Sequence, residues 1–265
     1  MAFSGKNCTL HLGGDTIDYA VFGTGMRPMV MIPGLNLRGV KGAAAALARM
    51  YRLFAEDYTV YVIDRRAVIP AGYTVRSIAG DVARAMDALH LSNADVLGVS
   101  QGGMIAQYLA LDRPELVRKL CLAVTLARPN DTVRTVIDAW VGMTERGEHD
   151  AMVRDMFERL YSEAYIQKYR PLLPVLAKLS RPKDPERFIT LAKACLTCDT
   201  YDRLDEIQCP VFVIGGRQDR IVDGEASEEL AQKLGCELYM YEALGHAAYE
   251  EAKDFNGRVL EFFRG

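Results

Sequence analysis

A serine held between small residues, at the point where a buried strand gives way to a helix, constrains this chain more than any other feature. Ser100 stands in Leu97-Gly-Val-Ser-Gln-Gly-Gly103, after the mostly apolar segment 94–97 and before the helix-like stretch 104–111. So sharp a turn strains the serine backbone, and its neighbours must be small because their Cβ atoms would collide with strand and helix. The hydroxyl is then held above the sheet edge, at the positive end of the following helix. The pattern predicts a nucleophile elbow and covalent acyl chemistry.

Segments typical of buried strands alternate with amphipathic segments along most of the chain. The predicted strands are 9–12 and 16–21, which form a hairpin, followed by 29–32, 58–63, 94–97, 119–124, 210–216 and 237–241. The predicted helices include 43–48, 75–89, 104–111, 225–234 and 254–263. This alternation predicts an α/β fold in which helices cover both faces of a mostly parallel sheet.

The alternation stops after Arg128. From about residue 130 to 204 no buried-strand run is evident, whereas apolar residues recur at helical spacing over 133–141, 152–160 and 188–195. The sequence therefore predicts a core made of residues 1–128 and 205–265, interrupted by an all-helical insertion at 129–204. One large domain with an insertion suits a chain of 265 residues better than two independent domains.

Charge and composition exclude several classes of function. The formal net charge is -3, which provides no electrostatic footprint for nucleic acid. Apolar runs are too short to span a membrane, and the first seven residues lack the apolar stretch of a signal peptide, so we expect a cytoplasmic protein. The six cysteines are expected to be free, buried thiols. Cys195 and Cys198 have metal-ligand spacing, but no second pair accompanies them and they lie in a helical pattern, so we predict no metal site.

A serine hydroxyl needs a base within hydrogen-bond reach, and this chain has only four histidines to supply one. His11 lies in the predicted hairpin, His90 leads into the next strand from the wrong edge, and His149 sits between two acidic residues in the insertion. His246 follows directly after the last predicted strand, at the carboxyl edge where the elbow also opens. Elimination and position predict His246 as the general base.

The acid that orients this histidine should come from another strand end, between the serine and the histidine in sequence. Asp219 follows the buried strand 210–216 and is the natural candidate. Asp223 lies four residues further on and stays open as a substitute, although an aspartate in either place could also cap a helix or form a turn.

The negative charge that develops on a carbonyl oxygen needs preorganised donors. We predict the backbone N–H of Gln101 as one donor and that of Leu35, in the loop after strand 29–32, as the other. Gly34 lets this loop come close to the substrate. Asn36 could add a side-chain amide, although a role in the turn fits it equally well.

With these residues in place, the chain resembles the α/β-hydrolase family. The shared motifs occur in the family's order: 19–25, Pro33-Gly34, Asp64-Arg65, 98–104, 214–219 and Gly245-His246. The resemblance implies eight mostly parallel strands, a helical cap over the site and no cofactor, and its serine–acid–histidine order is met by Ser100, Asp219 and His246. Within the family the elbow is similar to those of small bacterial esterases, enol-lactonases, haloperoxidase-like enzymes and carbon–carbon bond hydrolases. The chain departs from many relatives in having Pro33, not histidine, before Gly34.

These features lead to the hypothesis of a serine hydrolase for a small-molecule acyl substrate, namely a small carboxylic ester, thioester or lactone. One alternative is a carbon–carbon hydrolase that uses the same three residues. Another is a non-catalytic ligand-binding homologue. Formation of a homo-oligomer stays open.

Large, adaptable side chains in the insertion could set the substrate preference, although each could equally pack the insertion onto the core. The candidate substrate-binding residues there are Trp140, Met143, Met152, Met156, Phe157, Tyr161 and Tyr165.

Overall fold

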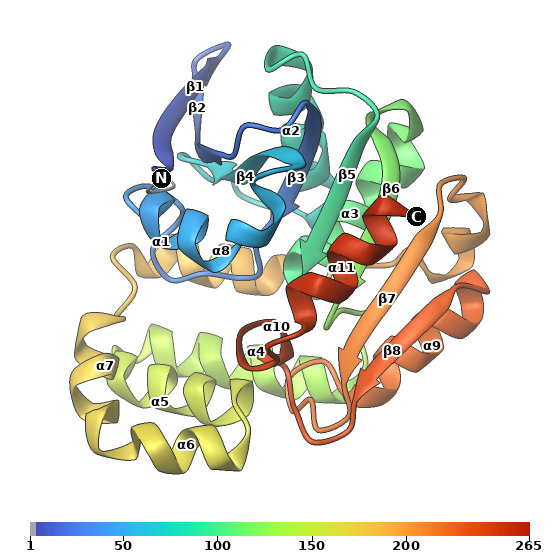
Figure 1. Ribbon diagram of the computed structural model, residues 1–265. Coiled ribbons are helices and arrows are strands. Elements are labelled where there is room, and N and C mark those ends of the chain that lie inside the picture. Colours follow the sequence, from blue (N-terminus) through green and yellow to red (C-terminus); the bar gives the residue numbers. More distant parts are fainter. Residues whose placement is uncertain (1–3) are drawn as a thin grey trace.

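The structure is a computed structural model that describes residues 4–265, over which eight strands form a single sheet (Figure 1). Residues 1–3, with which the predicted core begins, lie outside the described residues. Across the sheet the strand order is β1-β2-β4-β3-β5-β6-β7-β8. The strands are β1 Lys6–Leu12, β2 Asp15–Phe22, β3 Arg27–Ile32, β4 Tyr58–Arg66, β5 Ala94–Val99, β6 Val117–Ala123, β7 Val211–Gly216 and β8 Glu237–Tyr241.

The sheet is antiparallel at one end and parallel elsewhere. The hairpin of β1 and β2 pairs antiparallel with β4, and every pairing from β4 to β8 is parallel. All six residues of the central strand β5 are buried, which explains its mostly apolar composition, because a central parallel strand is covered on both faces. The predicted α/β class and mostly parallel sheet are confirmed.

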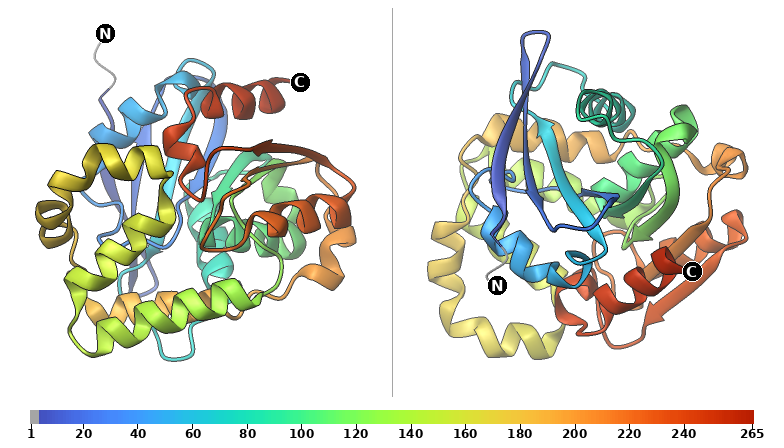
Figure 2. Two further views of the ribbon diagram at one scale, coloured as in Figure 1. Left: turned by 90° about the horizontal axis from the view of Figure 1, so that it is seen from below. Right: turned by 45° about the horizontal axis from the view of Figure 1, so that its top comes forward.

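Helices cover both faces of the sheet because successive side chains of each strand point to opposite sides. In β3, Val30 belongs to a hydrophobic cluster shared with helices α2, α3 and α9, whereas Met31 belongs to a second cluster shared with α1 and α11. Figure 2 shows these helices on either side of the strands. The helices of the core are α1 Ala44–Met50, α2 Val75–Ala88, α3 Gln101–Asp112, α9 Gly224–Leu234, α10 Ala248–Glu251 and α11 Phe255–Arg264.

Between β6 and β7 the chain forms helices and turns, as its helical spacing predicts. In Figure 1 the arrowheads of β5 and β7 point toward the side on which these helices lie. Prolines separate the shorter ones, since a proline cannot continue a helix from within. The helices of this segment are α4 Asp131–Glu145, α5 His149–Leu160, α6 Glu163–Tyr169, α7 Leu173–Leu179 and α8 Pro185–Cys195, and it also contains short 3-10 turns at 170–172 and 201–206. Two further 3-10 turns, at 52–54 and 114–116, precede β6.

Two local expectations differ from the structure. Helix α3 begins at Gln101 instead of near residue 104, because the glycines after the elbow adopt helical backbone where their lack of a Cβ is needed. Helix α8 ends at Cys195, so Cys198 lies in the turn beyond it and not within a helix. Both cysteines are nevertheless buried and free, and burial raises the pKa of the Cys195 thiol to about 11.

Candidate active site

Ser100 occupies a strained turn between β5 and α3. Its backbone has φ 54° and ψ -120°, a combination that a residue with a side chain adopts only where the surroundings enforce it. The surroundings here do so from both sides, since the Ser100 N–H donates to the Ala123 carbonyl over 2.8 Å and the Thr125 hydroxyl donates to the Ser100 carbonyl over 2.8 Å. Ala123 is the last residue of β6 and Thr125 lies two residues beyond it, so the neighbouring strand holds the elbow in shape.

The glycines around the serine are required by close packing. A Cβ on Gly98 would come within 2.6 Å of the Gly102 carbonyl oxygen, and one on Gly103 within 2.6 Å of the Thr125 side chain. A Cβ on Gly102 would overlap the carbonyl oxygen of Ile32, at the end of β3. Helix α3 can therefore start this close to the sheet only if these positions carry no side chain.

This packing makes a stability prediction. Gly102→Ala should lower the free energy of unfolding by about 3 kcal/mol, or roughly 10 °C in melting temperature, because backbone cannot yield as a flexible side chain can. Gly80→Ala is the matched control, since Gly80 is exposed in α2 with nothing near its missing Cβ, and alanine there should stabilise by about 1 kcal/mol. Thermal unfolding of both variants checks the opposite signs, and equal shifts would contradict the packing argument.

Two loops bring the candidate acid and base together at the carboxyl edge of the sheet. The Gln218 N–H donates to the Leu244 carbonyl over 3.0 Å, which joins the loop after β7 to the loop after β8. Gly216 and Gly245 also pack closely, because a Cβ on Gly216 would overlap the Gly245 carbonyl oxygen. Asp219 and His246 are thereby placed next to each other, 27 residues apart in sequence.

Ser100, His246 and Asp219 form one hydrogen-bonded chain. His246 Nε2 lies 2.9 Å from Ser100 Oγ, and His246 Nδ1 lies 2.7 Å from Asp219 Oδ2. His246 and Asp219 are both buried, at 3% and 8% exposure, which favours direct contact over bridging by solvent. A carboxylate only accepts hydrogen bonds, so Nδ1 donates to Asp219 and the lone pair on Nε2 faces the serine hydroxyl.

Asp219 is held as a carboxylate acceptor by its own loop. Its Oδ1 accepts the N–H groups of Ile221 and Val222 over 2.8 and 3.0 Å, which leaves Oδ2 for the histidine. The other candidate, Asp223, lies elsewhere: it caps helix α9 by accepting the Glu225 N–H over 3.2 Å. The structure therefore places Asp219, and not Asp223, against His246.

The two candidate oxyanion donors flank the serine. Gly34 lies against Ser100, since a Cβ on this glycine would stand 3.8 Å from Ser100 Oγ, so the loop carrying Leu35 borders the nucleophile. Within residues 4–265 the N–H groups of Leu35 and Gln101 have no protein acceptor. The side chain of Asn36, in contrast, accepts the Gly39 N–H over 2.8 Å and so shapes the turn.

The insertion residues separate into two groups. Trp140, Met143 and Met156 pack in the main hydrophobic cluster, and Trp140 Nε1 donates to Asp155 over 2.7 Å. Phe157 and Tyr161 instead line a cavity of about 360 Å³. The rings of this cavity contact one another in series, with centroids 4.6 Å apart for the tilted pair Phe157–Tyr161, 4.3 Å for the stacked pair Tyr161–Tyr165 and 4.5 Å for the tilted pair Tyr165–Tyr169.

This aromatic row begins beside the candidate base. The Ala247 N–H, next to His246, donates to the Leu160 carbonyl at the end of α5 over 2.7 Å. The Tyr161 hydroxyl donates to Glu250 over 2.6 Å. The end of α5 is thus attached to the histidine loop and its short helix α10, so the row extends away from the site into the helical segment.

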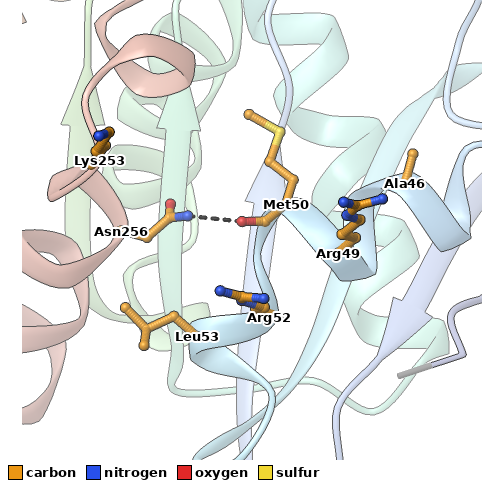
Figure 3. A pocket seen from close by; sticks show the side chains of 7 residues that line it. All are labelled: Ala46, Arg49, Met50, Arg52, Leu53, Lys253 and Asn256. Atoms are coloured by element: carbon orange, nitrogen blue, oxygen red, sulfur yellow. Dashed lines mark hydrogen bonds between the residues drawn. The ribbon is translucent and has the colours of Figure 1, made fainter. Parts of the chain in front are cut away.

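A larger pocket lies apart from these residues. Figure 3 shows this pocket, of about 690 Å³, between α1 and the start of α11, where Asn256 Nδ2 donates to the Met50 carbonyl over 2.9 Å. Its lining is basic and apolar, with Arg49, Arg52 and Lys253 around Leu53, and includes none of the candidate site residues.

Sequence reasoning missed the contribution of Arg65 and of the Gln101 side chain. Arg65 was noted only as part of a motif at a strand end, and Gln101 only for its backbone. The structure buries both and joins them by a hydrogen bond of 2.8 Å from Arg65 Nη2 to Gln101 Oε1. Arg65 lies two residues after the predicted strand 58–63, and a charged residue at a strand end on the edge where Ser100 opens was the available signal.

In the part of the chain that the structure describes, no group of three or more His, Cys, Asp or Glu side chains is arranged to hold a metal ion. Among the helices of residues 4–265, none combines the length and apolar character that crossing a bilayer requires.

Comparison with known proteins agrees with this geometry. A family model described as the alpha/beta hydrolase fold matches residues 27–253, which include the candidate nucleophile, acid and base. Among solved structures, the enol-lactonase from Burkholderia xenovorans superposes with a TM-score of 0.84, covering 97% of this chain and all of that chain at 20% identity. At this identity the likeness shows the fold alone.

This chain aligns with two curated relatives over most of their length. A protein of Rhizobium rhizogenes, to which carbamate hydrolase activity is ascribed under the name RutD, is 26% identical over 85% of this chain and 90% of its own. The pimeloyl-acyl-carrier-protein methyl ester esterase of Neisseria meningitidis is 27% identical over 73% of this chain and 76% of its own.

Proposed function

This chain belongs to the α/β-hydrolase fold family, and on that basis we propose that it is a serine hydrolase that cleaves a small carboxylic ester, thioester or lactone through an acyl-enzyme on Ser100. Family membership supports hydrolase activity, and the substrate and the covalent step are the proposal. The observation that carries it is the continuous chain of contacts from Ser100 Oγ through His246 to Asp219, at 2.9 and 2.7 Å.

The reaction starts with attack of Ser100 Oγ on the substrate carbonyl. As the new C–O bond forms, the hydroxyl proton passes to His246 Nε2, and Asp219 stabilises the resulting imidazolium through Nδ1–H. The negative charge on the former carbonyl oxygen is bound by the N–H groups of Leu35 and Gln101. His246 then delivers its proton to the leaving oxygen or sulfur, and the acyl group remains on Ser100.

Water completes the cycle by the same steps. His246 takes a proton from a water molecule as its oxygen attacks the acyl carbonyl, and the proton is returned to Ser100 when the C–O bond to the enzyme breaks. This route needs no cofactor or metal ion. We propose that helices α4 to α8 form a cap over this edge, with the aromatic row from Phe157 onward accepting an apolar part of the substrate.

Covalent labelling tests the proposal. A fluorophosphonate should modify Ser100 in the native protein at one label per chain, with the site read by mass spectrometry of a proteolytic digest. Acid-denatured protein is the control and should remain unlabelled, because activation depends on the folded triad. Absence of labelling in the native protein would favour the ligand-binding alternative.

A substrate panel then distinguishes the chemical classes. Nitrophenyl esters of increasing chain length, a thioester, several lactones, a carbamate and a vinylogous diketone are compared by kcat/KM. We expect the ester, thioester or lactone group to lead. Preference for the carbamate would place the chain with its Rhizobium relative, and preference for the diketone would indicate the carbon–carbon hydrolase.

A further inference from the structure

Arg65 is a buried cation without a hydrogen-bonded anion. It is the second-last residue of strand β4 and is 3% exposed, a depth at which arginine is normally paired with a carboxylate. The adjacent Asp64 carboxylate opposes the lowering of the Arg65 pKa, but no hydrogen bond joins the two side chains. The two oxygens of Asp64 accept the N–H groups of Val40 and of Arg65 itself over 2.7 and 2.8 Å. In the described chain, Nε and Nη1 of Arg65 have no hydrogen-bond acceptor at all.

The one nitrogen that is engaged joins the two segments around the nucleophile. Arg65 Nη2 donates to the Pro33 carbonyl over 2.6 Å and to Gln101 Oε1 over 2.8 Å. Pro33 leads into Gly34 and Leu35, and Gln101 follows Ser100, so each acceptor belongs to one half of the proposed oxyanion site. A single guanidinium thus connects one segment that lies 32 residues before it in the sequence with another that lies 36 residues after it.

Gln101 extends this connection to the cap. Its Nε2 donates to the Leu191 carbonyl over 2.6 Å and lies 3.1 Å from Cys195 Sγ, both in α8. The same helix is attached to the end of β4 a second time, because Arg187 donates to the Arg66 carbonyl over 2.6 Å. The position of α8 and the geometry around Ser100 are therefore linked through buried hydrogen bonds.

We infer that Arg65 is a positioning residue that holds the two oxyanion donors in register and brings a positive charge without a hydrogen-bonded anion to the segments that carry them. The inference rests on the proposed function. Keeping an unpaired charge in the interior is costly, and such costs persist where the charge serves a state other than the resting one. The transition state of acyl transfer is such a state, since negative charge then develops between the two segments to which this cation is bonded.

The protonation state agrees with this role. Burial lowers the pKa of the Arg65 guanidinium from its ordinary value. That value is so high that arginine remains charged at neutral pH. The charge is therefore present throughout the pH range in which an ester substrate would be turned over.

Three variants test the inference with nitrophenyl ester kinetics. Arg65→Met should lower kcat about 10- to 100-fold with KM changed less than about threefold, since the charge acts on the transition state and not on the bound substrate. Arg65→Lys should lose less, about 3- to 10-fold, because it keeps the charge without the planar fork. Arg66→Met is the matched control and should stay within about threefold of wild type, because Arg66 pairs with Asp15 and Asp81 instead.

The second measurement is the affinity for an aryl boronic acid. A merely structural role of Arg65 would leave this affinity unchanged. This inhibitor forms an anionic tetrahedral adduct on a nucleophilic serine, so its Kd should rise in Arg65→Met by the same factor by which kcat/KM falls. Combining Arg65→Met with Gln101→Met should cost less than the product of the single effects, because Gln101→Met already removes one acceptor of Arg65.

The outcomes separate cleanly. Wild-type kcat and boronate affinity in Arg65→Met would overturn the inference, as would a loss confined to KM or to the melting temperature. If Arg65→Met does not fold, Arg65→Lys decides in the same way. A wild-type protein that neither labels with fluorophosphonate nor hydrolyses any ester refutes the proposed function itself, whereas an active wild type with an unaffected Arg65→Met refutes only this inference.

Discussion

Ser100→Ala is expected to lower kcat for an aryl ester by a factor on the order of 10⁵ to 10⁶, the largest effect of any single substitution in this chain. The variant keeps the binding groups but lacks the oxygen that lies 2.9 Å from His246 Nε2, so no acyl-enzyme can form. Any remaining rate comes from water attack assisted by the donors around the carbonyl. Steady-state kinetics with a nitrophenyl ester measures the loss of kcat. The variant is purified on unused columns so that no wild-type enzyme contaminates it.

The fold should survive this substitution. Alanine at the strained turn loses only the hydroxyl, and the backbone bonds to Ala123 and Thr125 that hold the turn remain. We expect a melting temperature within a few degrees of wild type, by roughly the scale of a surface substitution. Ser77→Ala, an exposed position in α2, is the matched control and should leave kcat unchanged. Substantial turnover by Ser100→Ala would refute the covalent mechanism.

Asp219→Asn should lower kcat by about 10⁴-fold with little change in KM. The amide can donate to His246 Nδ1, which would shift the ring proton to Nε2 and leave no lone pair there to accept the serine proton. The shape of the site is conserved, since the side-chain oxygen can still accept the N–H groups of Ile221 and Val222. Activity is therefore lost because the histidine has the wrong tautomer and the negative charge is missing, and this loss should appear in kcat.

Asp223→Asn provides the comparison that the sequence left open. Asp223 caps α9 and accepts a bond from the Thr132 hydroxyl over 3.2 Å, and asparagine is an equally good capping residue. We expect kcat within about threefold of wild type, since no contact joins this residue to His246. If the two variants lose activity equally, or Asp223→Asn loses more, the assignment of the acid is wrong.

The elements of the fold were predictable because they depend on local patterns. Strand β5 is mostly apolar and helix α2 has one apolar face, and each pattern is complete within its own segment. His246 could be selected from the four histidines with only the order of strands and helices, because the carboxyl ends of parallel strands meet at one edge of the sheet. The elbow was predictable for the same reason, since its glycines and serine are neighbours in sequence.

Other features depended on which segments meet in space. Phe157 and Trp140 look alike as large apolar residues in the insertion, yet one lines a cavity and the other packs in the main cluster. In the sequence Arg65 is one of two adjacent arginines, and no local pattern predicts that it is buried and hydrogen-bonded to Pro33 and Gln101.

The sequence by itself determined the class of fold, the elbow with its small neighbours and the short list of partners for Ser100, because periodicity and steric demand act between residues close in the chain. Only the tertiary structure decided which aspartate faces His246, which aromatic side chains border a cavity and why a buried arginine is bonded to the segments on either side of the nucleophile. Burial and hydrogen-bond partners arise from contacts between distant segments, and their energies depend on a packing that no single segment contains.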